Sequence, residues 1–418
     1  MSEIIKSEEI KSRISGYMEI FLVLTLTALA ATIYFSQRRA SVYDTVAVGS
    51  LLVWRFILNH KSQRALPSSL VIWTALYLLS CFIGALLSEN RHWELTEFRR
   101  YIHFIIAGLL FTAPLSDNYR KITIASFFLC AAIAGVVGIL QFSGVLINPD
   151  PLAPHGLSPH PIVYAAILAF ACGSAIIMFF FRENGLFQSR MGKVILLVTI
   201  LLTFGGIISS ESRGVWIALV AACSVTLFLY DRKKTFSFFF VILIAMTAIF
   251  IFNSTLRQRA TSIVTSFYTE NEKGSTGNRL ELWKGSLMIF KERPLLGTGT
   301  GNFESSIKRL ITEKKLKEMP YTMHAHNIFF QALATRGLIG FVITIGFFAT
   351  LVKWGIKEIR EHGGIGGYAI LFCSVLTIVG GLTENNIENG KFLAALCLTI
   401  GLIGPYGAYQ VSRKSIKQ

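Results

Sequence analysis

The sequence predicts an all-α polytopic membrane protein with about twelve transmembrane helices. Of its 418 residues, 53% are hydrophobic and only 15% are charged, whereas a soluble domain carries about 25% charged residues to wet its surface. The apolar residues gather in runs of about 20, a length at which a helix crosses a hydrocarbon core about 30 Å thick. Since a backbone in lipid must satisfy its own hydrogen bonds, we expect these runs to be helices.

Twelve apolar runs follow one another along the chain, nine before a long polar segment and three after it. This order divides the chain into residues 1–252, the segment 253–327 and residues 328–418. The expected spans are 17–35, 43–59, 69–88, 98–114, 122–142, 161–181, 193–209, 214–230, 236–252, 328–352, 367–383 and 392–409.

The lysines and arginines indicate which side faces the cytoplasm. An even number of spans places both termini on one side, and Lys and Arg are more frequent in the tails and loops of that side, with Arg38-Arg39 as an exception. Because positively charged loops stay in the cytoplasm, we expect cytoplasmic termini and an outward-facing segment 253–327. The same bias accounts for the net charge of +16, so we expect no nucleic-acid partner.

The segment 253–327 is too polar to cross a membrane, and it is expected to form a loop subdomain. Residues 279–292 and 303–319 have helical periodicity, with apolar side chains on one stripe of each. The glycine-rich stretch 297–301 lacks the Gly-Lys-Ser/Thr of a nucleotide-binding loop. It predicts a turn in which two backbones approach closely.

Several kinds of chemistry are disfavoured. All six cysteines lie in apolar runs, so neither a disulfide framework nor a cysteine metal site is expected. No Asp-x-Asp pair and no Gly-x-Ser-x-Gly motif is present, which weakens metal-dependent sugar transfer and acyl hydrolysis. Charged residues within spans are few, with Arg55 the clearest and Glu384 and Glu388 near a span end. A secondary transporter is therefore a weaker alternative.

Arginines and histidines collect on the expected outer side. Arginine can bind a phosphate or diphosphate through two parallel hydrogen bonds, and histidine can remove a proton from a nucleophile at neutral pH. The residues that could do so are Arg99, Arg100, His155, His160, Arg213, Arg279, His324 and His326, with Trp283 and Asn327 near them in sequence.

Each of these residues by itself also has a structural explanation. Arg213 could extend from a span end to the membrane interface or pair with Glu211. Arg279 could be a solvated residue of a first helical turn, although the N–H groups of that turn would also favour an anion. His324 and His326 are two residues apart, and no carboxylate or cysteine is close to them in the sequence. We therefore expect no metal site there.

Together the motifs resemble the O-antigen ligase superfamily, which comprises O-antigen ligases, Wzy-type O-antigen polymerases and bacterial O-oligosaccharyltransferases. The resemblance covers the whole layout of spans and is most specific between residues 205 and 345. It is carried by 209–212 with Arg213-Gly214-Val215-Trp216, by Arg279 with Trp283, by 294–303, by His324-Ala325-His326-Asn327 with 328–331, and by Arg336-Gly337-Leu338-Ile339-Gly340.

The resemblance implies a GT-C-type glycosyltransferase with its active site at the periplasmic face of a Gram-negative inner membrane. Such a ligase would transfer a glycan from undecaprenyl diphosphate to a sugar hydroxyl of lipid A–core, without metal, ATP or another cofactor. Its partners would be the lipid-linked donor, the lipid A–core acceptor and membrane lipids, and we expect a monomer. The alternatives are the polymerase, which uses a second lipid-linked glycan as acceptor, and a protein O-oligosaccharyltransferase.

The resemblance also implies roles for individual residues. Arg213 and Arg279 match the arginines that hold the diphosphate, and Arg99 and Arg100 are further candidates for that role. His326 matches the histidine that activates the acceptor hydroxyl. A direct displacement by that hydroxyl would invert the anomeric carbon.

The identity of the base stays open, because this chain has His324 as well as His326. Asn327 and Trp283 are expected to support the site. Residues 156–161 loosely match a turn of the family, with His160 in place of one of its residues, which makes His160 a third supporting residue.

Overall fold

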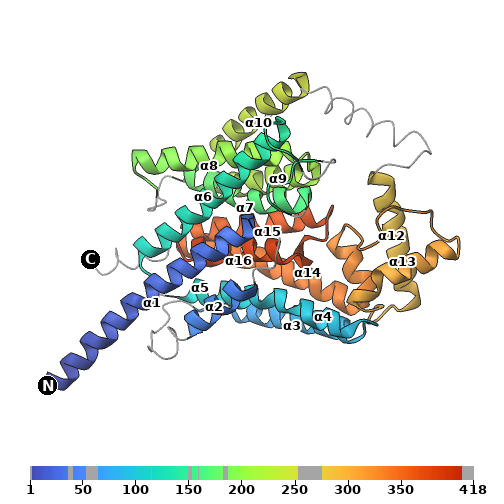
Figure 1. Ribbon diagram of the computed structural model, residues 1–418, viewed down its shortest axis with the longest axis horizontal. Helices are drawn as coiled ribbons and strands as arrows, with labels where there is room; N and C mark the ends of the chain where they lie inside the picture. Colours follow the sequence, from blue (N-terminus) through green and yellow to red (C-terminus); the bar gives the residue numbers. More distant parts are fainter. Residues whose placement is uncertain are drawn as a thin grey trace.

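The computed structural model describes residues 2–35, 41–52, 65–113, 115–148, 153–158, 160–181, 187–252 and 275–406. Every regular element in these ranges is a helix, which confirms the predicted all-α class. The protein forms a bundle of long helices, with α12 and α13 set to one side of it (Figure 1).

The elements follow the order of the apolar runs. Those before the long polar segment are α1 (Ser2–Phe35), α2 (Ser41–Leu52), α3 (Ser68–Leu86), α4 (Arg91–Glu97), η2 (Phe98–Tyr101), α5 (Ile102–Thr112), α6 (Asp117–Phe142), α7 (Pro161–Phe180), α8 (Arg190–Ser209), α9 (Arg213–Tyr230) and α10 (Arg232–Phe252). The later ones are α12 (Ser275–Glu292), η3 (Thr300–Asn302), α13 (Phe303–Thr312), α14 (Ile328–His362), α15 (Ile365–Gly381), η4 (Asn386–Glu388) and α16 (Gly390–Ile403).

Helices cover the described parts of all twelve expected spans. Seven of them are long and apolar enough to cross a membrane, namely Gly16–Phe35 of α1 together with α3, α6, α7, α8, α9 and α14, and α15 and α16 are shorter apolar helices. The chain is therefore a multi-pass membrane protein, while the count of twelve spans stays a prediction. The second half of the expected span 43–59 lies outside the described residues.

The centre of the bundle is α7, because nearly all of its side chains are buried. Small residues allow neighbouring helices to approach closely, and α7 contacts α6, α8, α9, α15 and α16. The Tyr164 hydroxyl donates a hydrogen bond to the Ala134 carbonyl of α6 (2.9 Å). A Cβ atom at Gly138 would lie 2.1 Å from that hydroxyl, so the contact requires glycine there.

The helices α12 and α13 form the loop subdomain, which here means the described residues 275–327. Its apolar cluster contains Leu282 and Ile289 of α12 and Phe303, Ile307 and Leu310 of α13. The predicted helix 303–319 was too long, since α13 ends at Thr312. The cause is Lys314, which adopts a left-handed conformation (φ 57°). The N–H groups of residues 314 and 315 close the helix by bonding back to Ile311 and Leu310.

The loop subdomain is joined to α14 by backbone hydrogen bonds. Gly337 interrupts α14 with φ 64° and ψ −163°, and the freed groups pair with the stretch 294–299. Thr298 N–H donates to the Ala334 carbonyl (3.0 Å), and Leu338 N–H donates to the Pro294 carbonyl (2.8 Å). The glycine-rich stretch thus serves the close backbone approach that its sequence predicts.

Candidate active site

The loop that carries the two histidines is fixed directly before α14. Asn327 caps the helix, and its Oδ1 accepts hydrogen bonds from Phe329 N–H (2.9 Å) and Phe330 N–H (3.1 Å). The Asn327 amide also donates to the Leu382 carbonyl (2.9 Å). One side chain therefore starts α14 and ties it to the turn that follows α15.

Ala325, between the histidines, is held by two further side chains. Its N–H donates to Gln331 Oε1 (2.9 Å), and its carbonyl accepts from the Trp283 indole N–H (3.0 Å). The Trp283 ring stacks on Phe330, with centroids 5.1 Å apart and planes at 16°. This contact couples α12 to the loop, so the histidines are presented by a fixed backbone.

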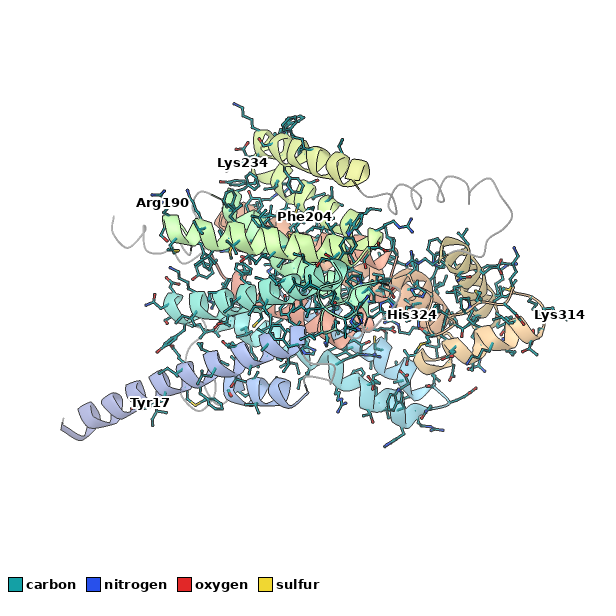
Figure 2. The ribbon with its side chains drawn as sticks, turned by 45° about the horizontal axis from the view of Figure 1, so that its top comes forward. Tyr17, Arg190, Phe204, Lys234, Lys314 and His324 are labelled. Carbon is teal, nitrogen blue, oxygen red and sulfur yellow. The ribbon has the colours of Figure 1, made fainter. Side chains whose placement is uncertain are left out.

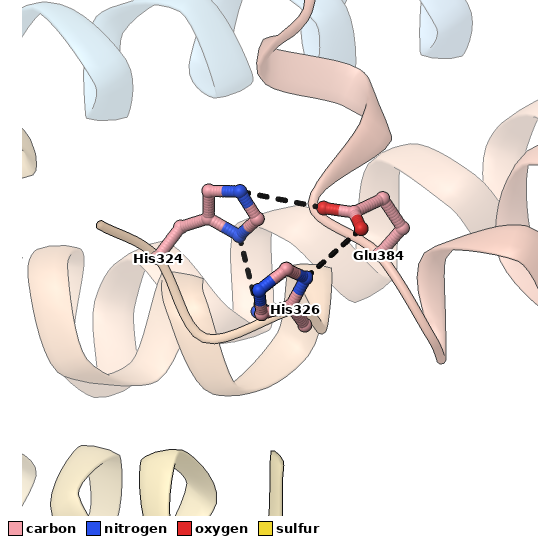
Figure 3. Close-up of side chains that lie close together, drawn as sticks. All are labelled: His324, His326 and Glu384. Carbon is pink, nitrogen blue, oxygen red and sulfur yellow. Dashed lines mark hydrogen bonds and ion pairs between the residues drawn. The ribbon is translucent and has the colours of Figure 1, made fainter. Parts of the chain in front are cut away.

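His324 and His326 meet the carboxylate of Glu384 (Figure 3). His326 Nδ1 lies 2.9 Å from Glu384 Oε2, and His324 Nε2 lies 3.5 Å from Glu384 Oε1. The two rings are close, with centroids 4.2 Å apart. In Figure 2 the labelled His324 lies where the bundle meets the loop subdomain, inward of Lys314.

The expectation that no carboxylate joins the histidines was therefore wrong. Glu384 was noted only as a charge near a span end, because it lies 58 residues beyond His326 in the sequence. A signal was available in the polar run Thr383-Glu384-Asn385-Asn386 between two apolar runs. On the expected topology this run lies on the same membrane side as the histidines.

The hydrogen bonds determine which ring nitrogens are free. Glu384 as a carboxylate can only accept a hydrogen bond, so His326 Nδ1 carries the proton that it shares with Glu384. The lone pair of a neutral His326 is then on Nε2. His324 Nδ1 accepts from the His326 backbone N–H (3.3 Å), which directs the proton of a neutral His324 to Nε2.

Glu384 is ionised at neutral pH. Burial by itself would raise the pKa of its carboxyl, but the hydrogen bond from His326 and the positive charges of protonated His324 and His326 lower that pKa to about 2. Burial lowers the pKa of His324, although the negative charge of Glu384 opposes that shift. The site thus favours a charged carboxylate beside a neutral imidazole, an arrangement that suits proton acceptance.

The backbone of His326 has a left-handed conformation, with φ 48°. This region is disfavoured for a residue with a Cβ atom and is often found at functional sites. The turn directs both rings toward Glu384, although the two histidines are only two residues apart in the sequence.

Arg279 lies within electrostatic range of this carboxylate, and Arg213 lies within electrostatic range of Arg279. Burial lowers the pKa of Arg279 in α12, the charge of Glu384 opposes the shift, and the positive charge of Arg213 adds to it. The guanidinium groups of both arginines form no hydrogen bond or ion pair with another described residue. Arg213 is exposed at the first position of α9. The structure therefore links Arg279 electrostatically to Glu384 and Arg213 to Arg279.

The pair Arg99-Arg100 is divided between solvent and protein. Arg99 is exposed in η2, whereas Arg100 points inward and donates from its guanidinium to the Glu388 carbonyl (2.8 Å). The Asn385 amide donates to Glu388 Oε2 (2.7 Å), and Asn385 N–H donates to Glu384 Oε1 (3.0 Å). Arg100 is thus linked to the turn that carries Glu384.

The remaining candidate histidines lie in the loop before α7. His160 caps this helix, and its Nδ1 accepts a hydrogen bond from Ile162 N–H (3.2 Å). Its positive charge, when present, lowers the pKa of His324, so His160 is near the site. His155 is buried, and among the described residues no hydrogen bond joins its Nδ1 to another candidate.

The chemistry of the donor atoms also allows a metal ion. His324, His326 and Glu384 each offer one ligand atom, and these atoms lie within 4.8 Å of one another. Two imidazoles and a carboxylate are a ligand set that Zn²⁺ accepts. Among the described residues, the group that offers such a ligand set is His324, His326 and Glu384. The expectation that glycan transfer needs no metal stays a prediction.

The fold and the site define a multi-pass helical membrane protein with a His–Glu pair and two available arginines. Residues 198–345 match the family model described as O-Antigen ligase, which confirms the predicted resemblance to the O-antigen ligase and polymerase superfamily. The matched segment contains Arg213, Arg279 and both histidines, whereas Glu384 lies beyond it.

A curated relative aligns over a longer part of the chain than the family model, and its description gives no function. The chain is 24% identical over 298 residues to an uncharacterised protein of Haemophilus influenzae (strain ATCC 51907 / DSM 11121 / KW20 / Rd), an alignment that spans 68% of this chain and 72% of the relative. The family match supports a ligase- or polymerase-type glycosyltransferase.

Proposed function

We propose that the protein is an O-antigen ligase that transfers a glycan from undecaprenyl diphosphate to a sugar hydroxyl of lipid A–core. The reaction takes place at the periplasmic face of a Gram-negative inner membrane, with both termini in the cytoplasm. The observation that carries the proposal is the His326–Glu384 contact at 2.9 Å, in a chain whose residues 198–345 match the O-antigen ligase family.

Arg213 and Arg279 bind the diphosphate of the donor. Both guanidinium groups are without another described partner, and each can form two parallel hydrogen bonds with phosphate oxygens. Negative charge grows on the diphosphate as the glycosidic C1–O bond breaks, and fixed positive charges stabilise it most in that state. The two arginines supply the charge that a metal ion would otherwise provide.

His326 accepts the proton of the acceptor hydroxyl. Its Nδ1 is bonded to Glu384, so Nε2 is the nitrogen with an available lone pair. The hydroxyl oxygen forms the new bond to the anomeric carbon, its proton passes to His326, and undecaprenyl diphosphate leaves with the electron pair of the broken bond. Attack opposite the leaving group inverts the anomeric carbon.

Glu384 fixes the tautomer and the orientation of His326 and stabilises the imidazolium that forms, as a carboxylate does beside the histidine of a serine-protease triad. Asn327 and Trp283 position the loop through the hydrogen bonds to Leu382 and Ala325. General-base assistance of this type contributes roughly 10²–10⁴-fold to a rate.

The test combines a deletion strain with purified protein. Loss of a ligase leaves long glycans on undecaprenyl diphosphate and an uncapped core, whereas loss of a polymerase leaves core capped with single repeat units. With purified protein, glycan transfer from the lipid diphosphate to lipid A–core should persist in EDTA. Transfer to a second lipid-linked glycan or to a protein would instead identify a polymerase or an O-oligosaccharyltransferase. Absence of any transfer would favour a transporter.

A further inference from the structure

We propose that His324, His326 and Glu384 bind one divalent transition-metal ion, with Zn²⁺ as the best fit, and that the bound ion blocks glycan transfer. The blocking rests on the proposed function, whereas the binding does not. The starting observation is that three ligand atoms from two separate segments lie within 4.8 Å of one another.

The separations are close to those of an occupied site. Zn²⁺ binds imidazole nitrogen and carboxylate oxygen at about 2.0–2.2 Å, which places neighbouring ligands of a tetrahedron roughly 3.4 Å apart. His324 Nε2 is 3.5 Å from one carboxylate oxygen and His326 Nδ1 is 2.9 Å from the other. Small rotations of three side chains on a fixed backbone are enough to receive the ion.

A fourth ligand position is accessible. The side chains of His324, His326 and Glu384 are 33%, 22% and 16% exposed, so the cluster is neither sealed nor fully solvated. Three protein ligands with one open position are typical of zinc sites that also hold water.

Metal binding gives His324 a role as a ligand, whereas the transfer mechanism gives it no role. In the proposed mechanism His326 and Glu384 act as a pair, and His324 has no step of its own. A neutral His324 presents Nε2 to the carboxylate because its Nδ1 accepts the His326 N–H at 3.3 Å. A metal ion between His324 and Glu384 would bind this nitrogen once its proton has moved to Nδ1, and the hydrogen bond from the His326 N–H would then be lost.

The surrounding charges limit the affinity without preventing binding. Arg279 repels a cation, since its charge interacts with that of Glu384. Glu384 itself supplies one negative charge, and the charge of Glu388 also reaches His324. A metal ion needs a lone pair on His326 Nδ1 and on His324 Nε2, so the proton of each neutral ring moves to its other nitrogen, and a protonated ring releases one proton to water. The ion therefore competes with protons for the same atoms.

Occupation by the ion disables the base. The metal ion binds His326 Nδ1 and the Glu384 carboxylate. The imidazole ring then contacts a cation in place of the Glu384 carboxylate. Its Nε2 then carries the ring proton and has no lone pair for the proton of the acceptor hydroxyl. Zn²⁺ is thus expected to inhibit transfer, and a chelator is expected to restore it.

The binding experiment uses full-length protein purified in detergent without a histidine tag. Zn²⁺ is titrated by calorimetry, and Co²⁺ is followed by its visible absorption. We expect one ion per chain for the unmodified protein and at least tenfold weaker binding for His324→Gln and for Glu384→Gln. The matched control is His362→Gln, which removes a histidine that pairs with one carboxylate, Glu358, at 3.1 Å, and it should bind like the unmodified protein.

Binding that is absent in the unmodified protein, or unchanged in both site variants, would overturn the metal site. Size-exclusion profiles and melting temperatures of the variants establish that they are folded. His324→Asn, which shortens the side chain without adding charge, gives a second test at the same position.

The inhibition experiment measures transfer against Zn²⁺ concentration, with each variant normalised to its own rate in EDTA. We expect the half-inhibiting concentration to rise at least tenfold in His324→Gln relative to the unmodified protein. Stimulation by Zn²⁺, or equal inhibition of both proteins, contradicts the blocking role. Metal binding without transfer under any condition would instead sink the proposed function and leave the metal site intact.

Discussion

His326 Nδ1 lies 2.9 Å from Glu384 Oε2, although 58 residues separate the two in the sequence. The contact joins the loop before α14 to the turn between α15 and α16, two segments that the long helix α14 keeps apart along the chain. It brings a histidine from that loop and a carboxylate from that turn into one hydrogen-bonded pair.

Replacement of Glu384 by Gln should lower kcat for transfer by about 10²-fold, because the histidine loses the charge that orients it and stabilises its protonated form. Glu384→Asp should recover part of the rate. Glu361→Gln is a suitable control, since Glu361 is exposed and pairs with Lys357 within α14. An unchanged kcat in Glu384→Gln would remove this residue from the mechanism.

The two histidines should differ in their effects on the rate. His326→Ala is expected to lose roughly 10²–10⁴-fold in kcat, and added imidazole should restore part of it. His324→Ala should cost less, since it removes the contacts with the His326 N–H (3.3 Å) and Glu384 Oε1 (3.5 Å) but leaves the His326–Glu384 contact in place. The assay is transfer to lipid A–core by purified protein. The reverse order of effects would assign the base to His324.

Arg213→Ala and Arg279→Ala should each reduce kcat/KM for the lipid diphosphate by about 10- to 100-fold. A hydrogen bond to a charged group contributes about 1.5–3 kcal/mol, and about 1.4 kcal/mol corresponds to a factor of ten. Lysine at either position should keep part of the activity, because it retains the positive charge but cannot form two parallel hydrogen bonds with a phosphate. The control is Arg309→Ala, whose guanidinium is exposed and paired with Glu292 and Glu313.

Arg100 should affect the rate of transfer indirectly, by positioning the turn that carries Glu384 and Glu388. Removal of its bond to the Glu388 carbonyl (2.8 Å) is expected to lower kcat while the donor KM stays within about twofold, since charge-assisted bonds fix geometry as well as energy. Arg100→Lys should recover part of kcat, and exposed Arg91→Ala is the neighbouring control. A raised donor KM with unchanged kcat would show instead that Arg100 binds the diphosphate.

Acid should weaken the contact between the histidine loop and the turn of Glu384. The pKa of this carboxyl falls from 4.5 to about 2 in the folded protein. A depressed pKa of an acid contributes stability that is complete above pH 4.5 and disappears as the pH falls through about 2. The melting temperature of the unmodified protein should therefore exceed that of Glu384→Gln at pH 6, and this difference should shrink by pH 3. A difference independent of pH would contradict the assignment.

The helices were predictable because composition alone decides which segments avoid water. Most described residues of each expected span are helical, and α14 begins at residue 328, where the apolar run predicted a span to begin. The end of α13 was not predictable from periodicity, since Lys314 has no sequence feature that requires its left-handed conformation.

The candidate site was predictable only in part, for a different reason. Arg213, Arg279 and the histidines stand out as polar residues beside apolar runs, whereas their distances depend on how α9, α12 and α14 pack. Glu384 belongs to a turn whose position depends on the bond from Asn327 to Leu382. The inward direction of Arg100 depends in the same way on Glu388.

The interruption of α14 at Gly337 makes the loop subdomain inseparable from the bundle. The carbonyls that the interruption frees are satisfied by residues 298 and 299, and a side chain at Gly337 would meet the Leu295 carbonyl at 2.4 Å. Grafting residues 275–327 onto another protein without α14 would leave those backbone groups without hydrogen-bond partners. A chimera that aims to change which sugars are accepted must therefore exchange this segment and α14 as one cassette.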